Sequence, residues 1–358
     1  MMITRVSVVL LGLCMATVAL AQMSRPVYER IPSGIMAQWQ WSTAPGEHWT
    51  EFRDIEQSDT WKPVRIGTSA PYPNEIRPTD QYRWPFIWAT EDIEAGKAVY
   101  FRRILHVDGQ VKAATLRLCS YGDETVVYLN GEQLLELDKP GTLTTVDITG
   151  RLRDGSNSLA VAAIRGARNF GLLVMGEAEL TWPPTQLKWI TTDKLDERES
   201  ADVPRAADPQ GKPAPAWTTS SAAMPIGSSL ESMYVVPRGW SFAEPGLSLE
   251  WRGTSYATVQ PPGGMPEYST AYFRASFSTG GAVTRTQLLI LGDDGYEVYV
   301  NGCPVAVEKR VDRAYIPLRV DVTEYMHGGN QLNTIAAQVT NDWGPGRIHI
   351  QPTVTICF

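Results

Sequence analysis

Two pairs of adjacent carboxylates are the residues that come nearest to acid–base chemistry. Asp123 is followed by Glu124, and Asp293 is followed by Asp294. Glycoside hydrolysis typically uses two carboxylates that flank one bond between sugars. Both pairs precede a run typical of a β-strand, however, and Asp commonly stabilises a turn at such a place. This position favours a structural role. A structural Ca²⁺ held by loop oxygens is a further hypothesis, for which the sequence singles out no ligands.

Aromatic residues beside polar groups offer binding chemistry. A Trp or Tyr ring can lie against the apolar C–H face of a sugar, while neighbouring polar groups bind its hydroxyls. Trp343 has this setting in a predicted loop, and Phe170 holds the matching place in the first half. A core role is the competing interpretation for any tryptophan. The candidate ligand-binding residues are Trp343, Asn341, Asp342, Arg347, Phe170, Arg168, Asn169, Trp84 and Trp88.

The sequence repeats itself at an offset of 171 to 174 residues. Self-similarity over this distance indicates a duplicated unit. The matching segments, in order, are Tyr100-Phe101-Arg102 with Tyr272-Phe273-Arg274, Val127-Tyr128-Leu129-Asn130-Gly131 with Val298-Tyr299-Val300-Asn301-Gly302, Val146-Asp147-Ile148-Thr149 with Val320-Asp321-Val322-Thr323, Gly155, Asn157 and Leu159 with Gly328, Asn330 and Leu332, and Asn169-Phe170-Gly171 with Asp342-Trp343-Gly344.

Each unit is expected to fold as β-strands. The runs 125–129 and 296–300 are rich in β-branched and aromatic residues, which suit a pleated, half-buried surface. Each run meets an Asn-Gly pair, which tolerates the positive φ angles of a two-residue hairpin turn. Short strands between turn signals, without long helical patterns, predict antiparallel sandwiches. The predicted fold is all-β, with two tandem antiparallel β-sandwiches.

Several of these segments have a counterpart in a known family. They are Trp88-Ala89, Tyr100-Phe101-Arg102-Arg103, Ala114-Thr115-Leu116, Tyr128-Leu129-Asn130-Gly131, and Gly292-Asp293-Asp294-Gly295 with Tyr299-Val300-Asn301-Gly302. They resemble the galactose-binding-like jelly-roll modules of bacterial glycosidases, above all the N-terminal module of α-L-rhamnosidases and the sugar-binding domain of family 2 glycoside hydrolases. The resemblance covers most of the chain and implies fold more specifically than function.

The expected domain limits follow from the repeat and from composition. Residues 1–21 read as a signal peptide, with Arg5, an apolar run and Ala19-Leu20-Ala21 as the cleavage site. Residues 22–33 form an N-terminal arm, 34–193 the first sandwich, 194–214 a Pro-rich acidic linker and 215–358 the second sandwich. The protein is therefore predicted to be exported to the periplasm, the cell surface or the medium.

The cysteines fit export without forming a disulfide scaffold. Beyond Cys14, three remain, so they cannot all pair within one chain. Cys303 follows a predicted hairpin turn, and Cys357 lies on the expected last strand of the same unit. We predict this pair as the disulfide, if one forms.

Composition excludes two classes of partner. The net charge is −7, so the basic surface of a nucleic-acid binder is missing. No apolar run long enough to span a membrane occurs after the N-terminus.

Binding is the expected activity. The chain has no room for a catalytic barrel after the second sandwich, so the leading hypothesis is an exported, non-catalytic protein that binds a glycan or polysaccharide. The alternatives are an envelope or matrix protein that uses its sandwiches for protein contacts, and a glycosidase with a different site.

Overall fold

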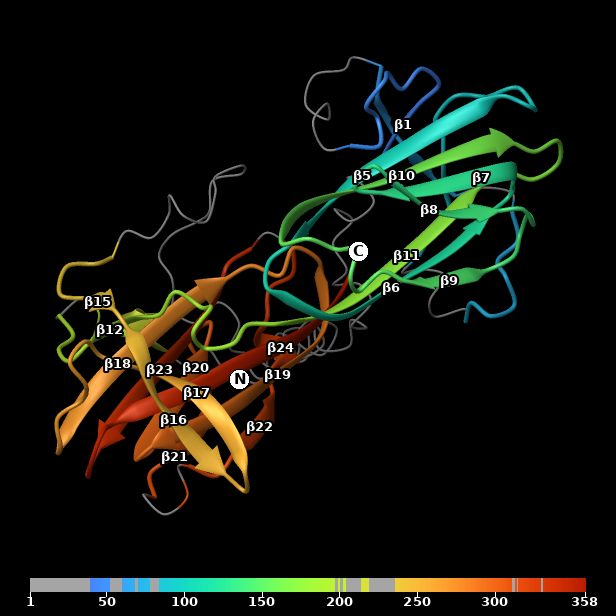
Figure 1. Cartoon of the computed structure of the whole chain (residues 1–358). Helices are drawn as coiled ribbons and strands as arrows, with labels where there is room; N and C mark the ends of the chain where they lie inside the picture. Colours follow the sequence, from blue (N-terminus) through green and yellow to red (C-terminus); the bar gives the residue numbers. More distant parts are fainter. Residues whose placement is uncertain are drawn as a thin grey trace, which may run out of the picture.

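The computed structural model describes residues 39–51, 60–67, 70–77, 84–196, 199, 202–203, 214–218, 236–310, 313, 315–329 and 331–358. The predicted signal peptide and N-terminal arm lie outside these residues. The described chain is built of antiparallel strands, which confirms the predicted all-β fold. Figure 1 shows the strands gathered into two halves that lie end to end.

Three large sheets make up these halves. Sheet A belongs to the first half and has the order β2-β1-β5-β10-β7-β8, and sheet C belongs to the second half and has the order β15-β12-β18-β23-β20-β21. The strands of sheet A are β1 (Gln40–Ser42), β2 (Lys62–Pro63), β5 (Ala98–Val107), β7 (Gly122–Leu129), β8 (Glu132–Leu137) and β10 (Gly155–Arg165). Those of sheet C are β12 (Ile190–Thr192), β15 (Ser241–Phe242), β18 (Ser269–Phe277), β20 (Gly295–Val300), β21 (Cys303–Glu308) and β23 (Asn333–Asn341).

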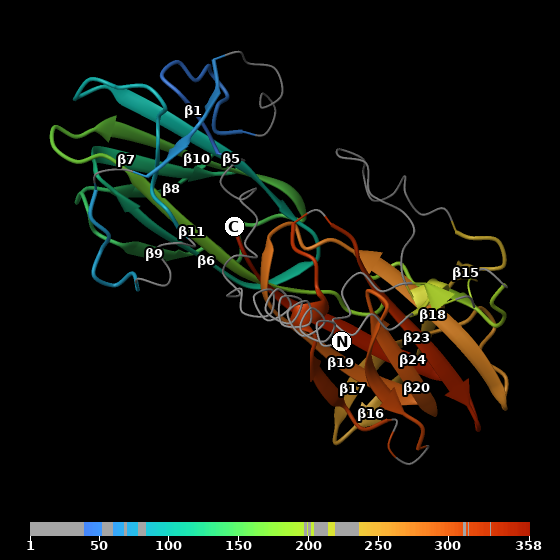
Figure 2. The same cartoon turned by 180° about the vertical axis from the view of Figure 1, so that it is seen from behind.

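Sheet B, with ten strands, runs through both halves. Its strands are β3 (Arg65–Ile66), β4 (Ile87–Trp88), β6 (Gln110–Ser120), β9 (Thr144–Asp147), β11 (Leu172–Thr181), β16 (Glu244–Trp251), β17 (Thr254–Gln260), β19 (Ala282–Asp293), β22 (Leu318–Asp321) and β24 (Arg347–Cys357). The halves meet where β11 pairs with β24, from Glu177 opposite Cys357 to Thr181 opposite Thr353. The view from behind shows the same continuity (Figure 2).

The core is formed by side chains that alternate between buried and partly exposed positions along the strands. In β5, Val99, Phe101 and Leu105 are buried, while Tyr100 and Ile104 between them are partly exposed. This period of two directs one set of side chains between the sheets. The short strands β13 (Asp202–Val203) and β14 (Ala214–Pro215) form a separate hairpin.

The two Asn-Gly hairpins form as predicted. Asn130 and Asn301 have φ angles of 55° and 48°, and the glycines that follow them have 86° and 82°. Positive φ at both central residues is the requirement of a type I′ turn.

The side chains of these asparagines make the same hydrogen bonds in both halves. Asn130 Nδ2 donates to Asn157 Oδ1 at 2.9 Å, and Asn301 Nδ2 donates to Asn333 Oδ1 at 3.0 Å. Asn157 and Asn333 then each bind an N–H and a C=O of one residue in the preceding loop, Arg153 in the first half and His327 in the second. Asn333, and not the predicted Asn330, is therefore the counterpart of Asn157.

The aromatic contacts on the outer faces also correspond. Trp49 meets Tyr100 and Tyr128 edge to face in the first half. Trp217 meets Tyr272 and Tyr299 in the same way in the second half.

The predicted domain limits do not follow the strand pairing. β12 pairs with β15 and β18 of sheet C, so residues 190–192 belong to the second sandwich and not to the end of the first. Of the predicted linker 194–214, the structure describes residues 194–196, 199, 202–203 and 214, and strand β13 within it pairs with β14. A three-residue strand carries too little local information to indicate which sheet it joins.

The predicted disulfide between Cys303 and Cys357 is wrong. The three cysteines of the described chain, Cys119, Cys303 and Cys357, are buried and not disulfide-bonded. Cys303 lies in sheet C, whereas Cys357 lies in sheet B. Facing sheets are about 10 Å apart, and a disulfide bridges Cα atoms no more than about 7 Å apart.

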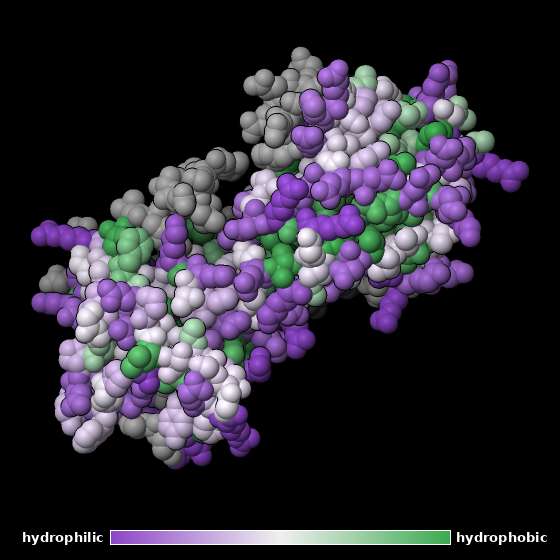
Figure 3. Space-filling model, in the orientation of Figure 1, coloured by the Kyte–Doolittle hydropathy of each residue, from purple (hydrophilic) through white to green (hydrophobic). Residues whose placement is uncertain are grey.

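Hydrophilic residues cover most of the visible face, with smaller hydrophobic areas between them (Figure 3). Among the residues described, no helix has the length and apolar character needed to cross a membrane.

Replacing Asn333 by Ala is expected to lower the free energy of unfolding by about 2–4 kcal/mol. The change removes hydrogen bonds to His327 and Asn301 inside a buried site, and their polar groups lose their partners. Urea unfolding measures the effect. Asn169→Ala, at an exposed position, is the control, and equal stability of the two variants would contradict this assignment.

Candidate functional site

Trp343 differs from the other tryptophans in its exposure. All twelve lie in the described residues, and nine are buried. Trp49 and Trp251 are partly buried, whereas the Trp343 side chain is 67% exposed. An exposed indole does not gain the free energy that burial gives to the other tryptophans. The loop that carries Trp343 is therefore the candidate site.

The buried carboxylate of Asp294 fixes the backbone of this loop. Its Oδ2 accepts hydrogen bonds from the backbone N–H of Asp342 at 2.6 Å and of Trp343 at 2.8 Å. Asp294 is only 4% exposed. Charge-assisted hydrogen bonds of this kind are stronger than neutral ones, so the loop has a defined conformation where it carries the indole.

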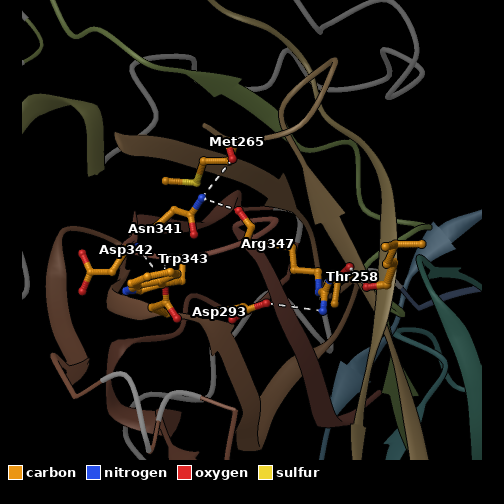
Figure 4. Close-up of polar contacts among 10 residues, drawn as sticks. Thr258, Met265, Asp293, Asn341, Asp342, Trp343 and Arg347 are labelled. Carbon is orange, nitrogen blue, oxygen red and sulfur yellow. Dashed lines mark hydrogen bonds and ion pairs between the residues drawn. The ribbon is translucent and has the colours of Figure 1, made fainter. Parts of the chain in front are cut away.

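Asn341 ties the loop to a neighbouring one. It is the last residue of β23 and is fully buried. Its Nδ2 donates to the carbonyl oxygens of Met265, Pro266 and Gly344, at 2.8 to 2.9 Å. Figure 4 shows Asn341 between Met265 and the pair Asp342 and Trp343. Asn341 therefore holds the loop in place from beneath. Direct contacts with a ligand, by ring stacking or by hydrogen bonds to its hydroxyl groups, are left to the neighbouring side chains.

Tyr268 brings a second exposed ring to this end of sheet C. Its side chain is 75% exposed, and it directly precedes β18, whose Ser269 pairs with Asn341. The neighbouring Glu267 accepts a hydrogen bond from the N–H of Gly344 at 3.4 Å. Neither Glu267 nor Tyr268 was among the predicted binding residues. The sequence feature that could have indicated them is their position shortly after the Pro-Pro-Gly-Gly turn, at the edge of the repeat.

Arg347 lies at the start of β24, and its Nη2 is 3.3 Å from Asp293 Oδ2. Burial raises the pKa of Asp293, an effect that the positive charge of Arg347 opposes. In Figure 4 the guanidinium lies beside Thr258, with Asp293 between it and Trp343. Arg347 thus neutralises a carboxylate under the loop and presents little of its side chain, 13%, to solvent.

The matching loop of the first half is closed. Phe170 is partly buried, with its ring centroid 5.6 Å from that of Trp88. Arg65 and Arg165 lie over the same ring at 5.3 and 5.2 Å. Arg168 and Asn169 beside it are exposed. Phe170 therefore offers no open face like that of Trp343.

The strand pairing explains why the two loops differ. Arg65 pairs with Trp88 beside Phe170, whereas Glu244 pairs with Gln260 at the corresponding ladder of the second half. The position of Arg65, which lies over Phe170, is therefore taken by Glu244 in the second half.

Trp84 and Trp88 are core residues, and the structure does not support their predicted binding role. Trp88 is 1% exposed and packs on Phe101 as well as Phe170. Trp84 is 9% exposed and belongs to a cluster with Phe86 and Met175. Neither indole has a free face on which a sugar could lie.

The two candidate pairs of carboxylates lie in different halves of the molecule. Asp123 and Glu124 are exposed on β7 of the first half, while Asp293 and Asp294 organise the Trp343 loop. The part of the chain that the structure describes contains no group of three or more His, Cys, Asp or Glu side chains placed to hold a metal ion. The predicted Ca²⁺ thus has no carboxylate cluster to hold it there.

Comparisons with known proteins give structural neighbours only. No family model matches the sequence, and no curated protein matches it. An anti-sigma factor domain-containing protein has a TM-score of 0.23 and 10% identity over 87% of this chain and 91% of its own. An α-L-rhamnosidase of Streptomyces avermitilis has a TM-score of 0.23 and 16% identity over 90% of this chain, which spans 29% of that enzyme. A lectin of Pleurotus ostreatus has a TM-score of 0.24 and 19% identity over 76% and 80% of the two chains.

TM-scores below 0.5 establish no function for this chain.

Replacing Asp294 by Ala is expected to release the Trp343 loop. The N–H groups of Asp342 and Trp343 lose their acceptor, at a cost of about 1–3 kcal/mol in unfolding free energy. Hydrogen exchange at these two amides should accelerate well beyond that of amides in β10. Unchanged exchange in a folded variant would show that the carboxylate does not hold the loop.

Proposed function

We propose that this protein binds carbohydrate through the Trp343 loop and the adjoining segment with Tyr268. The observation that carries the proposal is the exposed indole of Trp343 on a loop held by buried side chains. A sugar ring can lie on the indole, and the carboxylates of Asp342 and Glu267 can accept hydrogen bonds from its hydroxyl groups.

Preorganisation supports binding over a merely accidental exposure. Asp294 and Asn341 hold the loop without any ligand, so little conformational entropy is lost when a ligand binds. Loops on a rigid sheet scaffold commonly carry binding function. The closed loop at Phe170 limits the proposal to one site, in the second half, rather than one in each.

The proposed setting is outside the cytoplasm. It rests on the signal peptide predicted at residues 1–21, and glycans and polysaccharides are then the accessible ligands. The protein would act without catalysis, as a binding or glycosidase-accessory protein. The alternative, an assembly protein of the envelope or matrix, would instead use exposed apolar side chains such as Tyr315, Ile316 and Leu318 for protein contacts.

Replacing Trp343 by Ala is expected to weaken glycan binding at least tenfold, about 1.4 kcal/mol, because the stacking surface is removed. The measurement is a glycan array with the mature chain, followed by calorimetric titration of the best ligand. Phe242→Ala is the control, since Phe242 is also an exposed aromatic residue, 51%, but lies on β15. A blank array from folded protein, or equal binding by both variants, would contradict the proposal.

A further inference from the structure

The loop at Trp343 is bordered by carboxylates. Asp342 precedes the indole and is exposed, and the exposed Glu267 binds the N–H of Gly344 on its other side. Asp294 lies beneath, bound to the loop amides. Arg347 is the one cationic side chain among the described contacts of this site, and Asp293 pairs with it. The site therefore has a negative potential beside two exposed aromatic rings.

A buried acceptor without a partner lies beneath the loop. Asn341 is fully buried, yet its Oδ1 has no hydrogen-bond partner in the described structure. It directly precedes Asp342 in the chain and lies between Met265 and the pair Asp342 and Trp343 (Figure 4). Buried polar groups without partners are rare. Because this oxygen is fully buried, hydrogen bonds to a ligand remain with the exposed carboxylates of Asp342 and Glu267. Arg347 Nε and Nη1 also lack partners, but they lie beyond Asp293, away from the indole.

The corresponding loop of the first half has the opposite charge. Arg65 and Arg165 both lie over the ring of Phe170, and Arg168 beside it is exposed. The side chains around these two loops, which occupy equivalent places in the two halves, thus differ in the sign of their charge. The acidic border is therefore a property of the Trp343 site and is not required by the scaffold.

We infer that the Trp343 site selects glycans that carry unacetylated amino groups. An ammonium group provides three N–H donors and a positive charge for the carboxylates of Asp342 and Glu267. It is also attracted to the face of an indole. A uronic acid or a sulfated sugar would meet these carboxylates with like charge. This inference rests on the proposed carbohydrate binding and names its ligand class.

The test compares three tetrasaccharides by calorimetric titration of the mature chain. They are a glucosamine tetramer, its N-acetylated form and a galacturonic acid tetramer, at about pH 6, where the amine is protonated. The glucosamine tetramer is expected to bind at least tenfold more tightly than the N-acetylated form, and the uronic acid most weakly. Raising the salt from about 50 mM to about 500 mM should reduce this preference, because the ions screen exposed charges.

Variants separate the charge from the ring. The double variant Asp342→Asn with Glu267→Gln should bind the glucosamine tetramer and its N-acetylated form equally, because the carboxylates that attract the ammonium groups are gone. Glu136→Gln, an exposed carboxylate on β8, is the matched control and should keep the preference for the glucosamine tetramer. Equal binding of the amino and N-acetylated tetramers by the native chain would overturn this inference and leave carbohydrate binding standing. Binding of none of the three would overturn the inference, and a blank glycan array would overturn the proposed function with it.

Discussion

The pairing of β11 with β24 is the contact on which the arrangement of the whole molecule depends. Main-chain bonding from Glu177 opposite Cys357 to Thr181 opposite Thr353 turns two sandwiches into one body with a continuous sheet. Side chains reinforce the junction, since Trp182 packs on Phe277 with ring centroids 4.7 Å apart. Phe358 belongs to the main core, and a Cβ atom at Gly176 would overlap its ring. Only a residue without a side chain fits there.

The shared sheet leaves the outer ends free to differ. The Asn-Gly hairpins, the buried Asn157 and Asn333, and the outer Trp49 and Trp217 make matching contacts in both halves. Asp147 with Thr149, and Asp321 with Thr323, likewise form the same turn, in which hydrogen bonds from threonine lower the pKa of both carboxyls. The same interactions therefore stabilise the scaffold in both halves. The two halves differ in the loops at Phe170 and Trp343.

Local sequence was informative where local chemistry decides the structure. The Asn-Gly turns and the alternating strands beside them could be predicted because φ preference and side-chain period act over a few residues. Pairings between strands that are far apart in the sequence could not be predicted in this way. The strand at Ile190 joined the second half. The counterpart of Asn157 is Asn333, three residues beyond the predicted Asn330, because the loops before these residues differ in length.

At the site, residue type predicted the loop but not its contacts. Trp343 and Asp342 are adjacent on one loop, whereas Asp293 lies between the guanidinium of Arg347 and the indole. Trp84 and Trp88 have the same chemistry, yet packing buries them, and only the fold distinguishes the two cases. Tyr268 lies about 75 residues before Trp343 and reaches the site through the pairing of β18 with β23.

The junction also sets an order of events during synthesis. β11 is made early, but the residues of β24 that pair with it follow some 170 positions later. Until then the first half has an open strand edge, the kind of edge that attracts wrong partners. While the second half is still being synthesised, the first half therefore lacks the strand that completes its sheet. Until β24 pairs with it, β11 from Glu177 to Thr181 has a neighbouring strand on one side alone.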